Sequence, residues 1–204
     1  MSTITSPGFF RITNCIKLDE GLTRILCQIQ DVTSKLNNFY HRKTQIHPLR
    51  LREAITLSQY SLLCFKHQQS HAARENLIHE ILRLSLSIYL VTLLNESPPG
   101  VSQYDMLGSR IKSTIIEIWG HGGLDPEFSL WIMFIAASIV RDPDTKGYFM
   151  VSAAEIIETL GVSLWEDVET LFKSFFWVEK IHRGTFKLVW NALDIYWSNG
   201  GCFT

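Results

Sequence analysis

The sequence predicts an all-α fold, a single array of about seven or eight helices. Apolar residues recur at steps of three and four along most of the chain, the period of a helix with one buried face. Breaks rich in proline and glycine separate these segments at short intervals. No segment shows the alternation of apolar and polar residues that is typical of a strand.

The composition is that of a folded domain with a sizeable core. The chain has 204 residues, of which 46% are hydrophobic and 19% charged. A chain of this length buries roughly 70% of its unfolded surface, and this composition argues against a disordered linker. The formal net charge of −1 offers no excess of lysine and arginine for binding to phosphates. We therefore expect no direct binding of nucleic acid by this chain.

The cysteines and the apolar stretches indicate an intracellular, non-membrane protein. The cysteines are Cys15, Cys27, Cys64 and Cys202. Their scattered positions predict neither a disulfide framework nor a cysteine zinc site. The first ten residues lack the pattern of a signal peptide. Residues 81–94 and 128–140 are apolar but shorter than the roughly 20 residues of a membrane span, so we expect buried core helices there.

We expect one helical domain over residues 16–197. Residues 1–15 show no clear period and are expected to be irregular, and residues 198–204 form a short tail. The strongest candidate boundary is the Pro- and Gly-containing stretch 97–100. A loop within one array is the simpler interpretation of that stretch.

Four helices are expected in the first 120 residues. The first begins near Leu18. The second begins at Pro48, because the residue before a proline avoids helical angles and proline suits the first helical position. The third runs from an N-cap at Ser70 to about Asn95, and its apolar second half is typical of a central helix. The fourth covers about residues 102–119.

The segment after the flexible loop 120–123 carries the clearest helix start. Asp125 suits the N-cap and Pro126 the first helical position. The helix that follows reaches about Arg141 and is apolar on nearly every side, so it must be buried. Residues 142–144 are expected to close it.

The last third of the chain is expected to add two or three helices. One covers about residues 145–160 and stops at Gly161, which suits a left-handed C-cap. Ser163 and Glu166 predict a capping box that opens the next helix, ending near Phe176. The remainder is expected to be one more helix or a short extended piece.

One row of side chains has the composition of a metal site. It consists of His67, His71, Glu75 and His79. Ligands spaced four apart on one helix can bind zinc. A helix that starts at Ser70 leaves the first histidine in a loop, however, and no second source of ligands follows. A solvated polar face is the favoured interpretation, and we expect no bound metal.

The loop His121–Gly123 is similar to the glycine-rich loop of esterases. That interpretation needs a nucleophile elbow, G-x-S-x-G, after a strand. The nearest match, Gly161–Trp165, lacks the final glycine and the strand. No phosphate-cradling motif is present. We therefore expect a hinge between two helices, with no catalytic and no cofactor-binding residue.

Two groups of side chains near the carboxy-terminal end have a ligand-binding and a structural interpretation. The aromatic group consists of Trp165, Phe172, Phe175, Phe176 and Trp177. Most of its members recur on one helix face, which favours core packing over a stacking surface. The basic group consists of Lys173, Lys180, His182, Arg183 and Lys187. Acidic neighbours neutralise it, so a solvated face is expected.

Four segments carry a resemblance to a known family. They are Glu80–Leu90, Leu130–Ala137, Ser163–Val168 and Phe176–Glu179. In this order and spacing they resemble the fungal-specific transcription factor domain, the helical regulatory region downstream of the binuclear zinc cluster in fungal regulators. The resemblance covers about residues 75–193.

The resemblance implies a nuclear role in transcription regulation. It implies contacts with other transcription regulators or a homodimer partner, allows for a small-molecule effector, and carries over no catalytic residue. Members of the family carry a six-cysteine cluster, beginning C-x2-C-x6-C, that is missing from this sequence. We therefore expect contact with a promoter to run through a partner. The alternatives are a helical small-molecule-binding protein, an enzyme of unknown reaction, or a remnant that folds poorly.

Overall fold

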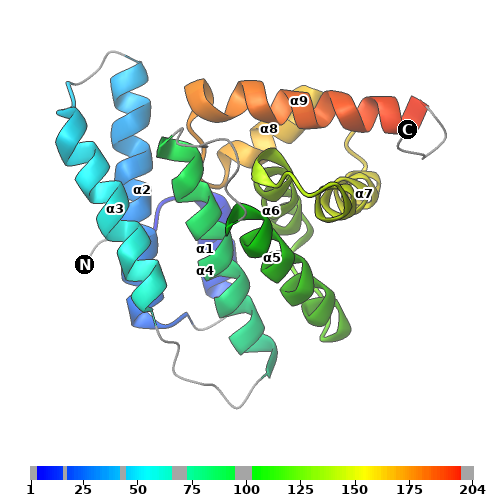
Figure 1. Cartoon of the computed structure of the whole chain (residues 1–204), viewed down its shortest axis with the longest axis horizontal. Helices are drawn as coiled ribbons and strands as arrows, with labels where there is room; N and C mark the ends of the chain where they lie inside the picture. Colours follow the sequence, from blue (N-terminus) through cyan, green and yellow to red (C-terminus); the bar gives the residue numbers. More distant parts are fainter. Residues whose placement is uncertain (1–3, 16–17, 42–44, 66–72, 95–102, 199–204) are drawn as a thin grey trace.

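The computed structural model describes residues 4–15, 18–41, 45–65, 73–94 and 103–198 (Figure 1). These residues form nine helices and no strand, which confirms the all-α fold with slightly more helices than expected. The helices are α1 (Pro7–Cys15), α2 (Glu20–Tyr40), α3 (Pro48–Cys64), α4 (Ala73–Leu94), α5 (Gln103–Gly120), α6 (Pro126–Ile139), α7 (Pro143–Leu160), α8 (Trp165–Lys173) and α9 (Glu179–Ser198).

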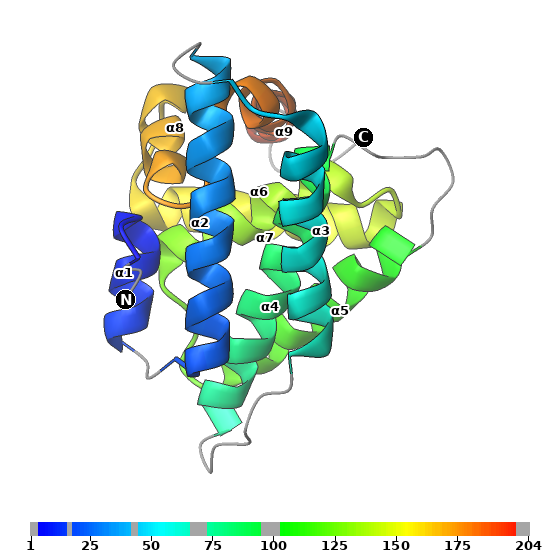
Figure 2. The same ribbon diagram turned by 90° about the vertical axis from the view of Figure 1, so that its left-hand side faces the viewer.

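Helix α4 lies at the centre of the array. It packs against α2 and α3 on one side, and against α5 and α6 on the other. Figure 1 shows α2 and α3 at the left, α4 and α5 in the middle and α9 across the top, and Figure 2 shows α2 and α3 side by side. The apolar residues on nearly every side of α4 follow from this position, because each face meets another element.

Helix α6 is the second buried element, and it confirms the expected start. The Asp125 side chain accepts a hydrogen bond from the Phe128 N–H at 2.9 Å, and Pro126 occupies the first turn. Every residue from Phe128 to Ala137 is buried. The side chain of Trp131 is fully buried in the middle of this stretch.

The expected irregular segment 1–15 contains helix α1. The Gly8 N–H donates to the Ser174 carbonyl at 2.8 Å. The fully buried ring of Phe9 contacts the rings of Phe128, Trp131, Phe175 and Phe176. A helix of nine residues is too short to be stable alone, so these tertiary contacts hold it. Its brevity also explains why no period was visible in the sequence.

Helix α7 begins at Pro143, within the residues that the sequence predicted only to close α6. The Asp142 side chain accepts from the Thr145 N–H at 2.9 Å, and Pro143 occupies the first turn. Residues 142–144 thus open α7, two residues before its expected start. The C-cap at Gly161 is confirmed, with a left-handed φ of 65°.

The predicted capping box at Ser163 is wrong. Helix α8 begins at Trp165, and its N-cap is Leu164, which makes no side-chain capping bond. Leu164 has extended backbone angles, φ −115° and ψ 143°, so Ser163 lies one residue too early to cap the helix. Helix α8 also ends at Lys173, so Phe176 lies beyond it. The remaining segment forms helix α9 rather than an extended piece.

Gly108 marks a close approach between α5 and the residue that follows α6. A Cβ atom added there would overlap Cγ2 of Val140, whereas one added at Gly147 in α7 would meet nothing within 4 Å. Gly108→Ala should therefore lower the free energy of unfolding by about 1 kcal/mol, because overpacking outweighs the gain in helix propensity. Gly147→Ala, the control, should raise it. Urea unfolding measures both changes, and equal stabilisation by both would contradict the close approach.

One described helix, α4, is long and apolar enough to cross a membrane. Helices α7 and α8 would qualify only together, and they are bent by 96° at their junction. In the apolar window of α4, 61% of the residues are buried inside the structure. This burial fits the expected core helix.

Candidate functional site

A groove with a volume of about 430 Å³ lies between α3, α4 and α5. Its lining consists of Gln59 and Leu63 from α3, Ser87, Val91 and Leu94 from α4, and Tyr104 and Leu107 from α5. Since α4 lies between the other two helices (Figure 1), it forms the floor and they form the walls. None of these seven described side chains carries a formal charge at neutral pH.

Local helix spacing explains why the groove is apolar. Ser87, Val91 and Leu94 follow one another at steps of four and three, so they share one face of α4. On α3 the buried residues are only Ile55, Ser58 and Leu62. Other apolar side chains of α3 therefore remain outside the core, and Leu63 is 73% exposed. The sequence shows this excess of apolar residues, but not that a groove runs beside it.

A charged cluster lies beyond one end of the groove. The Arg83 Nε and Nη2 donate to the two oxygens of Glu80, at 2.8 Å each, and the Arg110 Nη2 donates to one of these oxygens at 2.6 Å. The hydrogen bond from Arg83 lowers the pKa of Glu80, against the opposing effect of partial burial, and Arg110 lowers it further. Glu80 is therefore ionised at neutral pH, and the two guanidinium groups leave one net positive charge.

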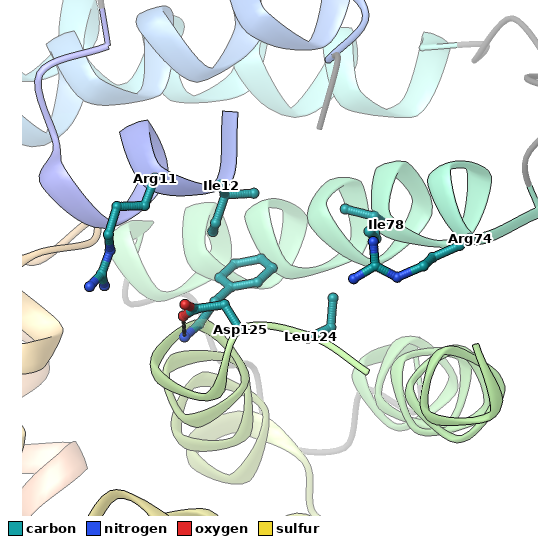
Figure 3. Close-up of a pocket in the computed structure, with 7 residues that line it drawn as sticks. Arg11, Ile12, Arg74, Ile78, Leu124 and Asp125 are labelled. Atoms are coloured by element: carbon teal, nitrogen blue, oxygen red, sulfur yellow. Dashed lines mark hydrogen bonds between the residues drawn. The ribbon is translucent and has the colours of Figure 1, made fainter. Parts of the chain in front are cut away.

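A smaller pocket of about 70 Å³ lies between α1, α4 and α6, with Arg11 and Arg74 on opposite sides (Figure 3). Arg11 pairs with Glu127, and Arg74 donates to the Gly123 carbonyl at 3.1 Å. Its volume is that of about two water molecules, far below the roughly 300–1,000 Å³ of ligand sites. The groove between α3, α4 and α5 is therefore a better candidate site than this pocket.

Of the histidine row, His79 contradicts the expected solvated face. His67 and His71 lie outside the described residues, and His79 is buried. The Nδ1 of His79 donates to the Glu75 carbonyl at 2.7 Å, and its Nε2 accepts from the Asp19 N–H at 3.2 Å. His79 thus joins α4 to the start of α2. Across the part of the chain that the structure describes, no three His, Cys, Asp or Glu side chains gather as metal ligands.

The loop His121–Gly123 connects α5 to α6. Gly122 and Gly123 have positive φ angles of 98° and 73°, and the Gly123 N–H donates to the Ile118 carbonyl at 3.1 Å. The described residues contain no strand, so this loop lacks the setting that an esterase site requires. The expected hinge between two helices is the arrangement observed.

The aromatic group packs in the core, as expected. All five side chains of the group are buried. The ring of Phe172 stacks on that of Trp177 at 6.0 Å and contacts Phe134 of α6. These rings join the carboxy-terminal segment to α6 and leave no exposed stacking surface there.

His182 contradicts the expected solvated basic face. It is buried, and its ring stacks on that of Tyr89 at 5.3 Å. Its Nδ1 accepts from the Val178 N–H at 2.9 Å, and its Nε2 lies 2.9 Å from the Thr92 hydroxyl. Burial lowers the pKa of His182 to about 3, so the ring is neutral at physiological pH. The four-residue steps from Val178 through His182 to Phe186 were the sequence signal of an inward face.

Three other members of the basic group, Lys173, Arg183 and Lys187, have acidic or aromatic partners. Glu169 forms ion pairs with Lys173 at 2.9 Å and with Arg183 at 3.3 Å. Burial alone would raise the pKa of Glu169, but the two cations outweigh it and lower the value. The Nζ of Lys187 lies 5.0 Å over the ring of Trp165. This face therefore offers little uncompensated positive charge.

No family model, curated protein or solved structure matches this chain. The resemblance over residues 75–193 therefore stays a prediction. The groove and its charged end are the structural basis for proposing a function.

Proposed function

We propose that the chain is a regulatory domain of a transcription factor that acts through a small-molecule effector and protein partners, without catalysis. The single observation that carries this proposal is the groove between α3, α4 and α5. Its volume of about 430 Å³ falls in the range of ligand sites, and it is mostly apolar with a few polar groups. The nuclear role and the regulatory partners come from the resemblance over residues 75–193.

The chemistry of the groove favours binding over catalysis. General acid–base catalysis uses groups such as histidine or a carboxylic acid within reach of the substrate. Among the described residues, neither a histidine nor a carboxylic acid lines the groove. Both ring nitrogens of His79 and of His182 already take part in hydrogen bonds within the fold. These two histidines therefore serve the structure rather than a reaction.

The charge distribution supports an indirect route to DNA. The formal net charge is −1, and Lys173 and Arg183 are engaged with Glu169. Affinity for duplex DNA comes largely from cations that neutralise phosphates. We therefore propose that a partner protein, or another DNA-binding segment, brings this domain to a promoter.

A reporter assay tests the proposed function. The chain, fused to an unrelated DNA-binding domain, should measurably change transcription of a reporter relative to that domain alone. Val91→Trp, which fills the groove from its floor, should remove the change. Leu188→Trp, which adds the same ring at an exposed position of α9, should leave it.

Two results would contradict the proposed function. One is a folded fusion with no effect on the reporter, and the other is an unchanged effect in the Val91→Trp variant. A cooperative melting transition for each variant excludes unfolding as the cause. A gel shift with the unfused chain and a duplex carrying paired CGG triplets is the companion control, and it should show no preference over a scrambled duplex.

The same groove also suits the alternative of a small-molecule-binding protein outside transcription. Ligand binding together with an unaffected reporter would favour that alternative.

A further inference from the structure

The groove has a long uncharged floor. Ser87, Val91 and Leu94 span seven residues of α4, which is about 10 Å at 1.5 Å per residue. Leu63 and Leu107 add apolar side chains to the two walls. An elongated apolar group would bury its surface along this floor and gain the usual free energy of transfer from water.

The charged cluster of Arg83, Arg110 and Glu80 lies on the same faces of α4 and α5 that line the groove. Arg83 lies four residues before Ser87 on α4, and Arg110 lies three residues after Leu107 on α5, so each is about one turn beyond the lining. Their shared bonds to Glu80 show that the two guanidinium groups meet there. The cluster therefore lies at one end of the groove rather than on a separate surface.

Arg110 has hydrogen-bonding capacity left for a ligand. Its side chain is 67% exposed, and among the described residues it donates only from Nη2 to Glu80. A guanidinium carries five N–H donors, and it matches a carboxylate in a bidentate arrangement. With one net positive charge, the cluster attracts an anion and repels a cation.

The size of the groove favours a small ligand over a protein segment. Seven of the described residues line it, whereas a stable protein interface uses roughly 20–30 residues on each side. Its volume matches that of sites for small molecules.

We infer that this groove binds an amphipathic carboxylate, with an alkyl chain along α4 and the carboxylate at Arg110. The inference rests on the proposed function, because it assigns a chemical class to the proposed effector. A medium-chain fatty acid is the simplest member of that class.

Isothermal titration calorimetry on the full chain tests the ligand class. The probes are decanoate, its methyl ester and decylammonium, which share a main chain of ten carbons and differ in head-group charge, each kept below its micelle concentration or solubility limit. Decanoate should bind about tenfold more tightly than the ester, the effect of charge-assisted hydrogen bonds at the carboxylate. Decylammonium should bind more weakly than the ester.

Three variants test where the carboxylate and the alkyl chain of the ligand bind. Arg110→Gln should weaken decanoate binding about tenfold and leave binding of the ester unchanged. Arg50→Gln, at an exposed position of α3 away from the groove lining, is the matched control and should change neither. Val91→Trp should abolish binding of both probes.

The outcomes separate this inference from the proposed function. Equal affinities for decanoate and its ester, or an Arg110→Gln variant with unchanged decanoate affinity, would overturn the assignment of the head group. Absence of binding by every probe, with reporter regulation still lost in Val91→Trp, would overturn the ligand class and leave the proposed function standing. Binding with the expected variant effects but without reporter regulation would support the ligand class and contradict the regulatory function.

Discussion

Replacing Trp131 with alanine should lower the free energy of unfolding by about 3–5 kcal/mol. The indole is fully buried at the middle of α6, and its ring contacts those of Phe9, Tyr89 and Phe175. Removing it leaves a cavity among elements from both ends of the chain. A domain with a total stability of roughly 5–15 kcal/mol would lose a large part of it. Equilibrium unfolding in urea measures the change.

A second tryptophan provides the control for that substitution. Trp119 in α5 is 42% exposed, so Trp119→Ala should cost about 1 kcal/mol or less. Similar losses in the two variants would show that α6 is not the centre of the core. The loss in Trp131→Ala also includes a hydrogen bond, because Trp131 Nε1 donates to the Phe176 carbonyl at 3.3 Å in the native structure.

Stability should fall as the pH drops below about 6.5, because of His182. Burial lowers its folded pKa to about 3, whereas the unfolded chain binds the proton near the ordinary value of 6.5. The unfolded state therefore takes up the proton first, and the contribution of His182 is complete above pH 6.5 and lost as the pH falls toward 3. Each pH unit in this window costs about 1.4 kcal/mol, so the loss is about 2 kcal/mol by pH 5 and about 5 kcal/mol at most.

Urea unfolding at pH 7.5, 6 and 5 isolates this effect. Glu80 and Glu169 have pKa values held below their ordinary value of 4.5, so their effect on stability appears mainly below about pH 5, at the lower end of this window. His182→Gln should flatten the pH dependence between pH 6.5 and 5. His121→Gln, at an exposed loop position, should keep it. A slope that is identical in the two variants would show that His182 is not the source.

Local signals predicted most helix positions because their physics is local. Asp125 with Pro126 and the left-handed Gly161 act within one turn of backbone, and both were found where the sequence placed them. Helix α1 escaped notice because tertiary contacts rather than its own pattern hold it. Ser163 had the right composition for a cap, but the extended angles at Leu164 shift the helix start by one residue.

The candidate site was beyond reach from the sequence because it depends on which helices are neighbours. The apolar side chains of α3, α4 and α5 are evident one helix at a time, but their spacing does not say that α4 lies between the other two. His182 was wrongly predicted to be exposed for a related reason. Its basic neighbours suggested solvent, while the aromatic partner that buries it, Tyr89, comes from a distant helix.

The docking of α1 has a consequence for synthesis on the ribosome. The Ser6 hydroxyl bonds to the carbonyl of Ser174, 168 residues further along the chain, and Phe9 packs on Phe175 and Phe176. At roughly 5–20 residues per second, α1 emerges about 10–30 s before the segment that covers it. During that interval Phe9 lacks these two partners. The nascent chain therefore carries an apolar segment around Phe9 that a chaperone can bind until residues 174–176 have left the ribosome.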